Sequence, residues 1–469
     1  MAKYEQLVDQ IRDQIQNEVW QVGDKLPSLR KQTELSNMSL MTVMQAYQVL
    51  ESQGWISSHA RSGYFVAPKV TSSTPKASKT AIESSENIDI NDFIFEVLQE
   101  SRKPHVVSFG SVYPDTGVHP RNQLNKALAS VTRTMPTSSA LYNFPPGNDQ
   151  LRQIIAKRYA AQGMNISPDE IVITAGALDA LNLSLQSVTK PGDWVVIESP
   201  GFYGALQALQ RLNLRALSIR TDPSEGIDLQ ALETALENYP VKACWLMTNS
   251  QNPTGCTMPE EKKQQLVSLL EKHDVYLIED DVYAELHFSD KKPLPAKAFS
   301  KAGKVMHCSS FSKTLLSGFR IGWVAAGEMA IPVQKLQLMS ALSVSTPIQQ
   351  AFAEYLSTRN YENHLRKMRR VLEQNKFAIW QEARNCFPEQ VDIHYLDGGY
   401  FLWVELPDHL DAAELYRLAI KENISIAPGK MFSLNQRFNN CFRMNASFEC
   451  GDREKQAIRR LAELIYKMI

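Results

Sequence analysis

One lysine, Lys313, lies in a segment rich in hydroxyl groups, S-S-F-S-K-T-L-L-S-G-F-R-I-G-W, at residues 309–323. The segment follows a short apolar run that is typical of a buried strand. A lysine that forms a Schiff base needs a position fixed by a rigid strand and a polar rim around it. A phosphate nearby needs an arginine fork and hydroxyl donors, which Ser310, Ser312 and Arg320 can supply. The pattern is compatible with a Schiff-base lysine beside a phosphate site. On composition alone, however, a lysine in a polar loop is more often simply solvated.

Four further predicted strands end in turns that carry small, aromatic, amide or acidic residues. We expect these strands at 170–174, 194–198, 243–248 and 275–279. The residues that they and the lysine strand present at one rim are Gly176, Phe202, Asn252, Asp280, Tyr283 and Lys313. Each signal has an ordinary alternative, because such turns are common and an aromatic side chain more often only packs. Together they suit a pyridine ring with a phosphate arm and an aldehyde.

Strands and helices alternate from about residue 105, which predicts a mixed α/β layer fold with a mostly parallel sheet. Beyond about residue 345 we expect long helices and a few strands, at 399–406, 424–427 and 441–446. This pattern indicates a small α+β C-terminal domain, and Arg443 lies in its last strand.

The body resembles the fold-type I pyridoxal-phosphate enzymes of the aminotransferase class. The motifs that carry the resemblance stand in family order: Y-N-F-P-P-G-N-D-Q-L-R (142–152), T-A-G-A-L-D-A-L (174–181), E-S-P-G-F-Y-G (198–204), N-P-T-G (252–255), E-D-D-V-Y (279–283), S-S-F-S-K (309–313), G-F-R-I-G (318–322) and F-R-M-N (442–445). The resemblance covers about residues 105–469. It implies an α/β fold-type I transferase body and pyridoxal 5'-phosphate as its cofactor.

The same resemblance implies a role for each matching residue. Lys313 would form the internal aldimine, and its amine, once freed by an amino acid, would move the α-proton. Asp280, rather than Asp281, would pair with the pyridinium nitrogen. Asn252 and Tyr283 would contact the ring hydroxyl.

Four roles remain. Phe202 would stack on the ring, and Tyr142 would reach the phosphate of the partner subunit. Arg443 would bind a substrate carboxylate bidentately, with a surface salt bridge as the alternative. The residues that would hold the phosphate are Gly176, Ala177, Ser310, Ser312 and Arg320.

The first 69 residues follow a different plan. Helical periodicity predicts a first helix that ends near Val19, a short second helix capped by Ser28, and a third helix from Leu40 to Gln53 capped by Ser39. Two short strands, at 55–58 and 64–66, complete a winged helix-turn-helix, whose third helix would enter the major groove of DNA.

This head resembles the GntR-type DNA-binding domain in L-P-S-L-R (26–30), M-S-L-M-T-V-M-Q-A-Y (38–47), L-E-S-Q-G-W-I (50–56) and S-G-Y-F-V (62–66). The resemblance implies that Ser28, Arg30, Ser39 and Thr42 contact phosphates or base edges, and that Arg61, Ser62 and Gly63 probe the minor groove. The chain departs from the family at Leu40, where an arginine is usual, and at Ala60, where a glycine is usual. The head holds seven Lys or Arg against seven Asp or Glu. A helical protein–protein module is the alternative.

We expect four parts: a winged helix domain at 1–69, a flexible linker at 70–90, a cofactor-binding large domain at 91–344 and a small domain at 345–469. Ser and Thr dominate 71–85, which predicts a mobile tether. Six scattered cysteines without a C-x-x-C pair, and no apolar run long enough for a membrane span, fit a cytoplasmic protein without a metal site.

Head and body together resemble the MocR subgroup of bacterial transcription regulators. The resemblance implies a pyridoxal-phosphate-dependent regulator that binds double-stranded operator DNA and responds to an amino acid, an amine or the cofactor itself. It also implies a homodimer with exchanged heads. Two alternatives stay open, a metabolic aminotransferase with a vestigial head and a cofactor sensor without turnover.

Overall fold

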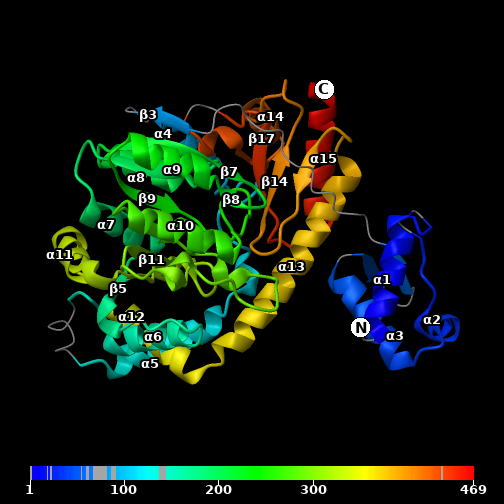
Figure 1. The fold of residues 1–469 in the computed structure, drawn as a ribbon, viewed down its shortest axis with the longest axis horizontal. Helices are drawn as coiled ribbons and strands as arrows, with labels where there is room; N and C mark the ends of the chain where they lie inside the picture. The colour runs from blue at the N-terminus through cyan, green and yellow to red at the C-terminus, as the bar shows by residue number, and fades with distance from the viewer. Residues whose placement is uncertain are drawn as a thin grey trace. The chain divides into compact units, whose positions relative to one another are not determined.

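The structure is a computed structural model that describes residues 3–17, 19–21, 24–53, 55–59, 63–66, 82–85, 91–136, 144–434 and 437–469. Its contacts divide the chain into two compact units, Met1–Thr74 and Pro75–Ile469. Each unit encloses its own apolar core. We call the first unit the head and the second the body, and describe each separately (Figure 1).

The head consists of three helices and a hairpin, as the sequence predicts. The elements are α1 (Lys3–Gln16), α2 (Leu29–Ser36), α3 (Leu40–Ser52), β1 (Ile56–His59) and β2 (Gly63–Val66). The two strands pair antiparallel. Ser28 caps α2 by accepting a hydrogen bond from the Lys31 amide, and Ser39 caps α3 by accepting one from the Thr42 amide. The first helix ends at Gln16, three residues earlier than expected.

The body is built on a large sheet with the strand order β3-β7-β6-β9-β10-β11-β12-β5. The strands are β3 (Ile82–Ser85), β5 (Ile171–Thr174), β6 (Trp194–Ser199), β7 (Arg215–Asp222), β8 (Gly226–Ile227), β9 (Val241–Leu246), β10 (Tyr276–Asp280), β11 (Val305–Ser310) and β12 (Gly322–Ala325). The central strands run parallel, whereas β12 is antiparallel to both β11 and β5. The carboxyl ends of β6, β9, β10 and β11 therefore meet at one rim.

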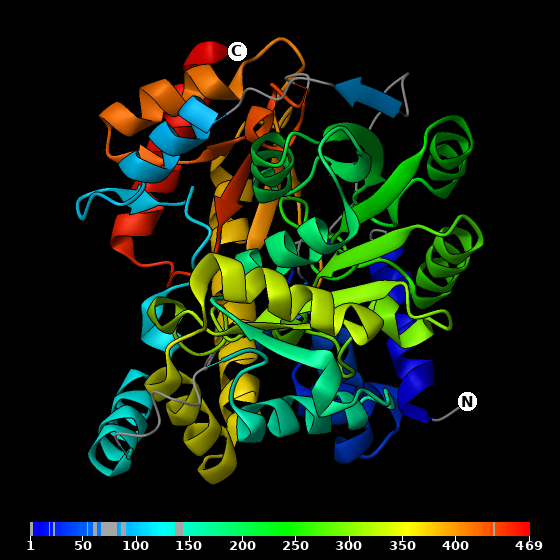
Figure 2. The ribbon, with the colours of Figure 1, turned by 90° about the vertical axis from the view of Figure 1, so that its left-hand side faces the viewer.

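Helices cover both faces of this sheet because successive strand residues point to opposite faces (Figure 2). One face packs against α7 (Ala177–Val188), α8 (Tyr203–Arg211) and α11 (Ala330–Ala341). The other face packs against α9 (Leu229–Asn238) and α10 (Glu260–Lys272). A further cluster joins the β5–β12 end to α5 (Arg121–Thr134), α6 (Asp149–Ala160) and α12 (Thr346–Thr358). This layering confirms the α/β body predicted from the sequence.

The C-terminal part is an antiparallel sheet with the order β13-β14-β17-β16. Its elements are α13 (Tyr361–Cys386), β13 (Asp392–His394), β14 (Phe401–Glu405), α14 (Ala412–Lys421), β15 (Ile424–Ser425), β16 (Ala427–Pro428), β17 (Cys441–Asn445) and α15 (Asp452–Met468). The helix α4 (Asn91–Glu100) buries Ile94 and Val97 in the same core. In addition, β4 (Val107–Ser108) pairs with β15. Residues near the start of the expected large domain therefore pack with the C-terminal strands.

Most of the expected linker, 70–90, lies outside the described residues. Its described part is β3, which pairs antiparallel with β7 at the edge of the large sheet. The tether expected over 71–85 is therefore wrong for residues 82–85. Pairing along an edge strand uses backbone groups, so a Ser-rich composition does not prevent it. Among the described helices, none is long and apolar enough to cross a membrane.

Candidate cofactor site

Lys313 lies just after β11, at the rim where the parallel strands end. Its side chain is only 8 % exposed. The Nζ atom donates a hydrogen bond to the carbonyl oxygen of Val112 at 2.8 Å, and the hydroxyl of Tyr400 donates to the same carbonyl at 2.9 Å. The rings of Tyr113 and Tyr283 lie 4.7 and 5.5 Å from Nζ. Lys313 is therefore held in a fixed, buried position, and the alternative of a solvated loop lysine is wrong.

The surroundings of Lys313 favour its neutral, nucleophilic form. Burial lowers its pKa to about 7, and the positive charge of Arg443 lowers it further, while Asp280 opposes the change. A lysine with a pKa near 7 is partly neutral at physiological pH, so its nitrogen can attack a carbonyl carbon.

Asp280 ends β10 at the same rim and is 2 % exposed. Its Oδ1 atom is buried without a hydrogen-bond partner in the described part of the chain. Burial raises its pKa to about 7, and the neighbouring charge of Asp281 adds to this. A buried carboxylate in this state needs a cationic or N–H donor, which the described residues do not supply at Oδ1.

Asp281, by contrast, has a partner for each oxygen. Asn249 Nδ2 donates to its Oδ1 at 3.0 Å, and His307 Nε2 lies 2.9 Å from its Oδ2. Lys263, buried behind them, donates from Nζ to Asn249 Oδ1 at 2.6 Å. The hydrogen bond from His307 lowers the pKa of Asp281 although burial opposes this. Asp281 is therefore a structural anion, and Asp280 is the carboxylate whose Oδ1 has no partner among the described residues.

A chain of buried hydrogen bonds continues from Asp281 through the sheet. Trp323 Nε1 donates to the Tyr159 hydroxyl at 2.9 Å, and that hydroxyl lies 2.6 Å from His307 Nδ1. Every polar hydrogen finds an acceptor when Tyr159 donates to Nδ1 and the Nε2–H of His307 donates to Asp281. We therefore place a hydrogen on His307 Nε2 and assign Nδ1 as the acceptor for the Tyr159 hydroxyl.

The Arg320 side chain lies directly beside the start of α7. Gly176 caps α7 with a φ of +94°, and a Cβ placed there would collide with the Arg320 guanidinium. Arg320 Nη1 donates to Ser312 Oγ at 3.3 Å, and Ser310 Oγ accepts from the Ser312 amide at 3.3 Å. Ala177, the first residue of α7, lies against Gly322 of β12. The structure thus brings together all five residues expected to hold a phosphate at one helix N-terminus.

Arg443 lies in β17 and is 1 % exposed, so the alternative of a surface salt bridge is wrong. Its Nη1 donates to Asn252 Oδ1 at 2.7 Å and its Nη2 to the Gly110 carbonyl at 2.8 Å. Its Nε has no hydrogen-bond partner in the described chain. The guanidinium carbon lies 4.3 Å from the Phe401 ring centroid. A buried guanidinium with a free N–H can receive a carboxylate.

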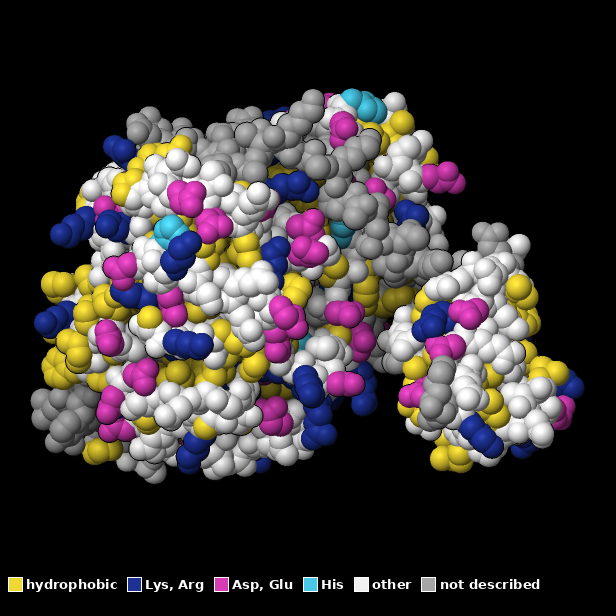
Figure 3. All heavy atoms as spheres, in the orientation of Figure 1, with side chains coloured by type: hydrophobic (Ala, Val, Ile, Leu, Met, Phe, Trp, Pro, Cys, Tyr) yellow, Lys and Arg dark blue, Asp and Glu magenta, His cyan; other side chains and the backbone are white. Residues whose placement is uncertain are grey.

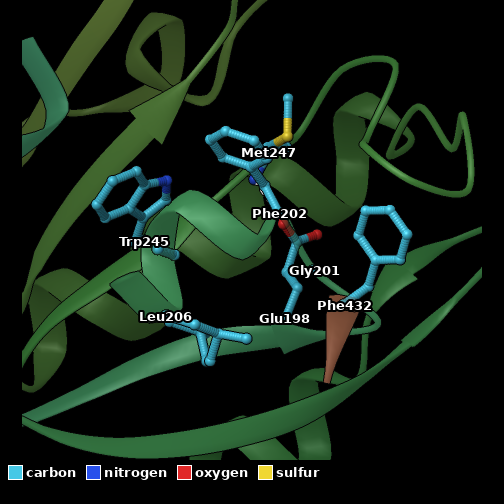
Figure 4. A pocket seen from close by; sticks show the side chains of 9 residues that line it. Glu198, Gly201, Phe202, Leu206, Trp245, Met247 and Phe432 are labelled. Atoms are coloured by element: carbon cyan, nitrogen blue, oxygen red, sulfur yellow. Dashed lines mark hydrogen bonds between the residues drawn. The ribbon is translucent and has the colours of Figure 1, made fainter. Parts of the chain in front are cut away.

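Phe202 directly precedes α8, after β6, and Figure 4 shows it beside Met247 and above Glu198. Its ring lies 4.8 Å from that of Tyr203 and fits over Gly204, where a Cβ would collide with it. Phe202 also packs against the cluster that contains Tyr283. It is thus an aromatic surface close to the rim, as the predicted ring contact requires.

Some predicted residues can be placed only in part. Tyr142, Arg61 and Ser62 lie outside the described residues. In the head, Arg30 is exposed at the start of α2, and Gly63 begins β2 with a φ of +108°. Ser28, Ser39 and Thr42 stand at the starts of α2 and α3, where the caps use their hydroxyl groups.

Several residues at the site were not predicted from the sequence. Val112, Tyr113 and Tyr400 contact Lys313 or share its acceptor, but lie far from it in the chain and in no motif. Glu198, inside the expected E-S-P motif, is buried and accepts from the Met247 amide at 2.8 Å. Burial raises its pKa to about 8.

These groups fit pyridoxal 5'-phosphate. A nucleophilic lysine stands near an aromatic side chain, a carboxylate lacks the donor that a pyridinium N–H provides, and a glycine leaves room beside an arginine. Lys313 would hold the aldehyde carbon, Asp280 the ring nitrogen and Arg320 the phosphate. When bound, this cofactor supplies an electron sink for reactions at the α-carbon of an amine.

Comparison with known proteins agrees with this assignment. Residues 104–458 match the family Aminotransferase class I and II, and residues 3–66 match Bacterial regulatory proteins, gntR family. Among solved structures, the kynurenine aminotransferase of Pyrococcus horikoshii in complex with PMP is 28% identical, with a TM-score of 0.75 over 81% of this chain and 95% of that chain. A multiple substrate aminotransferase from Thermococcus profundus is 26% identical, with a TM-score of 0.74 over 81% and 96%.

Relatives that cover both units also exist. The HTH-type transcriptional regulator YdcR of Escherichia coli (strain K12), called uncharacterized, is 58% identical over 100% of both chains. The regulator YjiR of the same organism is 32% identical over 100% of this chain and 99% of its own. With its gntR-family head and its aminotransferase class I and II body, the chain belongs to the MocR subgroup of the GntR-type regulators and uses pyridoxal 5'-phosphate.

Proposed function

We propose that this protein is a DNA-binding transcriptional regulator whose body binds pyridoxal phosphate at Lys313 and responds there to an amino acid, an amine or the cofactor itself. The observation that carries the proposal is the full-length similarity to a protein named as a transcriptional regulator, which includes both units. The head supplies a helix-turn-helix, and the body supplies a buried lysine, a carboxylate with an unpartnered oxygen and a buried arginine whose Nε lacks a partner among the described residues.

The chemistry of the site favours amino-group ligands. Lys313 would hold the cofactor, and an amine that enters the site would come close to both. Its carboxylate, where it has one, would meet Arg443, whose Nε has no partner among the described residues. Lys313, with a pKa near 7, can then hold a proton or release it close to the α-carbon. Because these groups can also move that proton during turnover, slow transamination is a second property of the same site.

We further propose that two copies assemble as a homodimer with exchanged heads, which would bind two half-sites. A ligand that changes the body would then alter the spacing of the heads by shifting the population of two conformations. The linker between the units sets how far this change can be transmitted.

The test is a DNase footprint of the cofactor-loaded protein on the DNA upstream of its own gene, with each protein amino acid and its decarboxylated amine added in turn. A footprint whose extent changes with one ligand supports the regulator. A footprint that no ligand or cofactor changes contradicts the coupling between body and head. If the visible spectrum instead converts fully to the amine form of the cofactor and a 2-oxo acid restores it, while DNA is not bound, the protein is a metabolic aminotransferase.

A further inference from the structure

The helix that would enter the major groove, α3, has an unusual exposed face. Its sequence, L-M-T-V-M-Q-A-Y-Q-V-L-E-S, contains no lysine or arginine, and its only charged residue is Glu51 near its end. Leu40 is 49% exposed and Met41 is 68% exposed. Gln45 and Gln48 are also exposed. The face that is free to contact a ligand is therefore apolar at its start and carries amides further along.

The other side of α3 is used for packing. Val43, Ala46, Tyr47 and Leu50 are fully buried in the core of the head. Burial of this side fixes the rotation of the helix, so Leu40 and Met41 cannot turn inward without exposing the core. Ser39 Oγ and Thr42 Oγ1 lie 2.8 Å apart, and Ser39 accepts from the Thr42 amide. Since these hydroxyls bond to one another, the side chains next to them are the better candidates for base contacts.

Met41 and Gln45 lie on the same exposed face of α3. Because they are four residues apart, their side chains project about 6 Å apart along the helix axis. In the major groove, guanine is bound most often by arginine or lysine, adenine by the amide of Asn or Gln, and the thymine methyl group by apolar side chains. The exposed methionine and leucine suit thymine methyl groups, and the glutamine that follows them suits an adenine edge. Arginine and lysine, the usual partners of guanine, are absent from this helix.

We infer that α3 reads A·T base pairs, with Leu40 and Met41 in contact with thymine methyl groups and Gln45 in contact with an adenine edge. This inference rests on the proposed DNA-binding function and names its sequence class. The seven-to-seven charge balance of the head agrees with it, because a head with little net charge gains less from phosphates and depends more on base contacts. Acidic, basic and apolar side chains are interspersed on the face of the head seen in Figure 3.

The test uses the full-length, cofactor-loaded protein. A pool of random duplexes is selected by binding, and the enriched duplex is then resynthesised with each thymine replaced singly by deoxyuridine, which lacks only the methyl group. At the thymine under Met41 we expect affinity to fall about 4-fold, the effect of one buried methyl group. In Met41→Ala the same replacement should have no effect. Val19→Ala, which shortens another exposed apolar side chain of the head, should leave the 4-fold loss unchanged.

Gln45 is tested in the same way. Replacing the contacted adenine by 7-deazaadenine removes the N7 acceptor, and Gln45→Ala should abolish sensitivity to that change. Enrichment of G·C pairs at the positions nearest α3, or equal binding of thymine and uracil duplexes, overturns the inference while leaving DNA binding intact. The second result would show that Leu40 and Met41 do not contact thymine methyl groups. Failure to enrich any duplex overturns the DNA-binding function itself.

Discussion

Asp280 and Asp281 are consecutive at the end of β10, yet Asp280 Oδ1 has no hydrogen-bond partner in the described chain, whereas both oxygens of Asp281 are bonded. Their pKa values shift in opposite directions for this reason. Burial raises that of Asp280 to about 7, and the hydrogen bond from His307 lowers that of Asp281. Two neighbouring carboxylates are thus assigned to different tasks by their surroundings.

This difference predicts opposite effects of Asp280→Asn and Asp281→Asn on the cofactor-free protein. Between pH 4 and pH 7 the unfolded chain has lost the Asp280 proton while the folded chain retains it, so stability falls as pH rises through this window. Asp280→Asn removes that loss. We expect it to raise the free energy of unfolding by about 1–3 kcal/mol at pH 8, after allowance for an unpartnered amide.

For Asp281 the sign is reversed, because its lowered pKa adds stability above the unfolded pKa that is lost only in acid. Asp281→Asn should therefore lower the free energy of unfolding at pH 8. Urea unfolding of both variants at several pH values is the measurement. Asp280→Asn should also weaken cofactor binding. Two variants that change stability with the same sign would contradict this account.

A second prediction concerns Gly176 and uses Gly192 as its control. Both have positive φ, +94° and +89°, but a Cβ at Gly176 would collide with Arg320, whereas nothing lies within 4 Å of one at Gly192. Each change to alanine should lower stability by about 1 kcal/mol through backbone strain. Only Gly176→Ala should weaken binding of pyridoxal phosphate, by about 10-fold or more, because a phosphate loses charge-assisted hydrogen bonds.

The measurement is a spectral titration with pyridoxal phosphate and, separately, with pyridoxal. Because pyridoxal has no phosphate, Gly176→Ala should affect its binding much less. Equal weakening by Gly176→Ala and Gly192→Ala would show that strain alone, and not the collision with Arg320, accounts for the result.

The sequence predicts much of this site because its residues follow strands in recognisable order. The apolar runs predict β5, β6, β9, β10 and β11, and the turns after them contain Gly176, Phe202, Asn252, Asp280 and Lys313. The resemblance favoured Asp280 over Asp281, but the physical reason for this choice needed coordinates. It depends on His307 of β11 and on Asn249, which follows β9, because both bond to Asp281.

Other features depend on contacts across the chain and have no local signal. Tyr159 on α6 and Trp323 on β12 are 164 residues apart, and their hydrogen bond forms where α6 packs in one cluster with the β5–β12 end of the sheet. Asn252 was expected to contact a ring hydroxyl and Arg443 a carboxylate, and the structure shows that these two side chains also bond to one another. The strand β12 was not anticipated, since its first two residues, Gly322 and Trp323, end the lysine segment and the strand continues only to Ala325.

A third prediction separates Lys313 from another buried lysine, Lys376. Burial lowers the pKa of both to about 7. Lys376, however, donates to the carbonyls of Leu396 and Gly398 at 2.6 and 2.9 Å, away from the rim. Borohydride reduction of the cofactor-loaded protein, followed by peptide mass spectrometry, should place the cofactor adduct on Lys313 alone. An adduct on Lys376, or one that persists in Lys313→Ala, would show that a lowered pKa suffices without the surrounding site.

The fourth prediction concerns Arg443 and the carboxylate of the ligand. Arg443→Lys keeps a positive charge but removes the planar fork that bonds to Asn252 and Gly110. We expect the most responsive amino acid to bind about 10- to 100-fold more weakly, which corresponds to the loss of one charge-assisted hydrogen bond. The amine that lacks its carboxylate should bind with nearly unchanged affinity, because it never contacts the guanidinium.

Spectral titration of the cofactor-loaded protein with both ligands measures this difference, and Arg460→Lys is the matched control. Arg460 forms ion pairs with Glu422 and Glu463 on the surface. The same substitution there removes a planar guanidinium that has no contact with the cofactor site. If Arg443→Lys weakens the amine as much as the amino acid, the guanidinium supports the pocket wall rather than the carboxylate. If it weakens neither, the carboxylate is bound elsewhere and the unpartnered Nε of Arg443 serves another group.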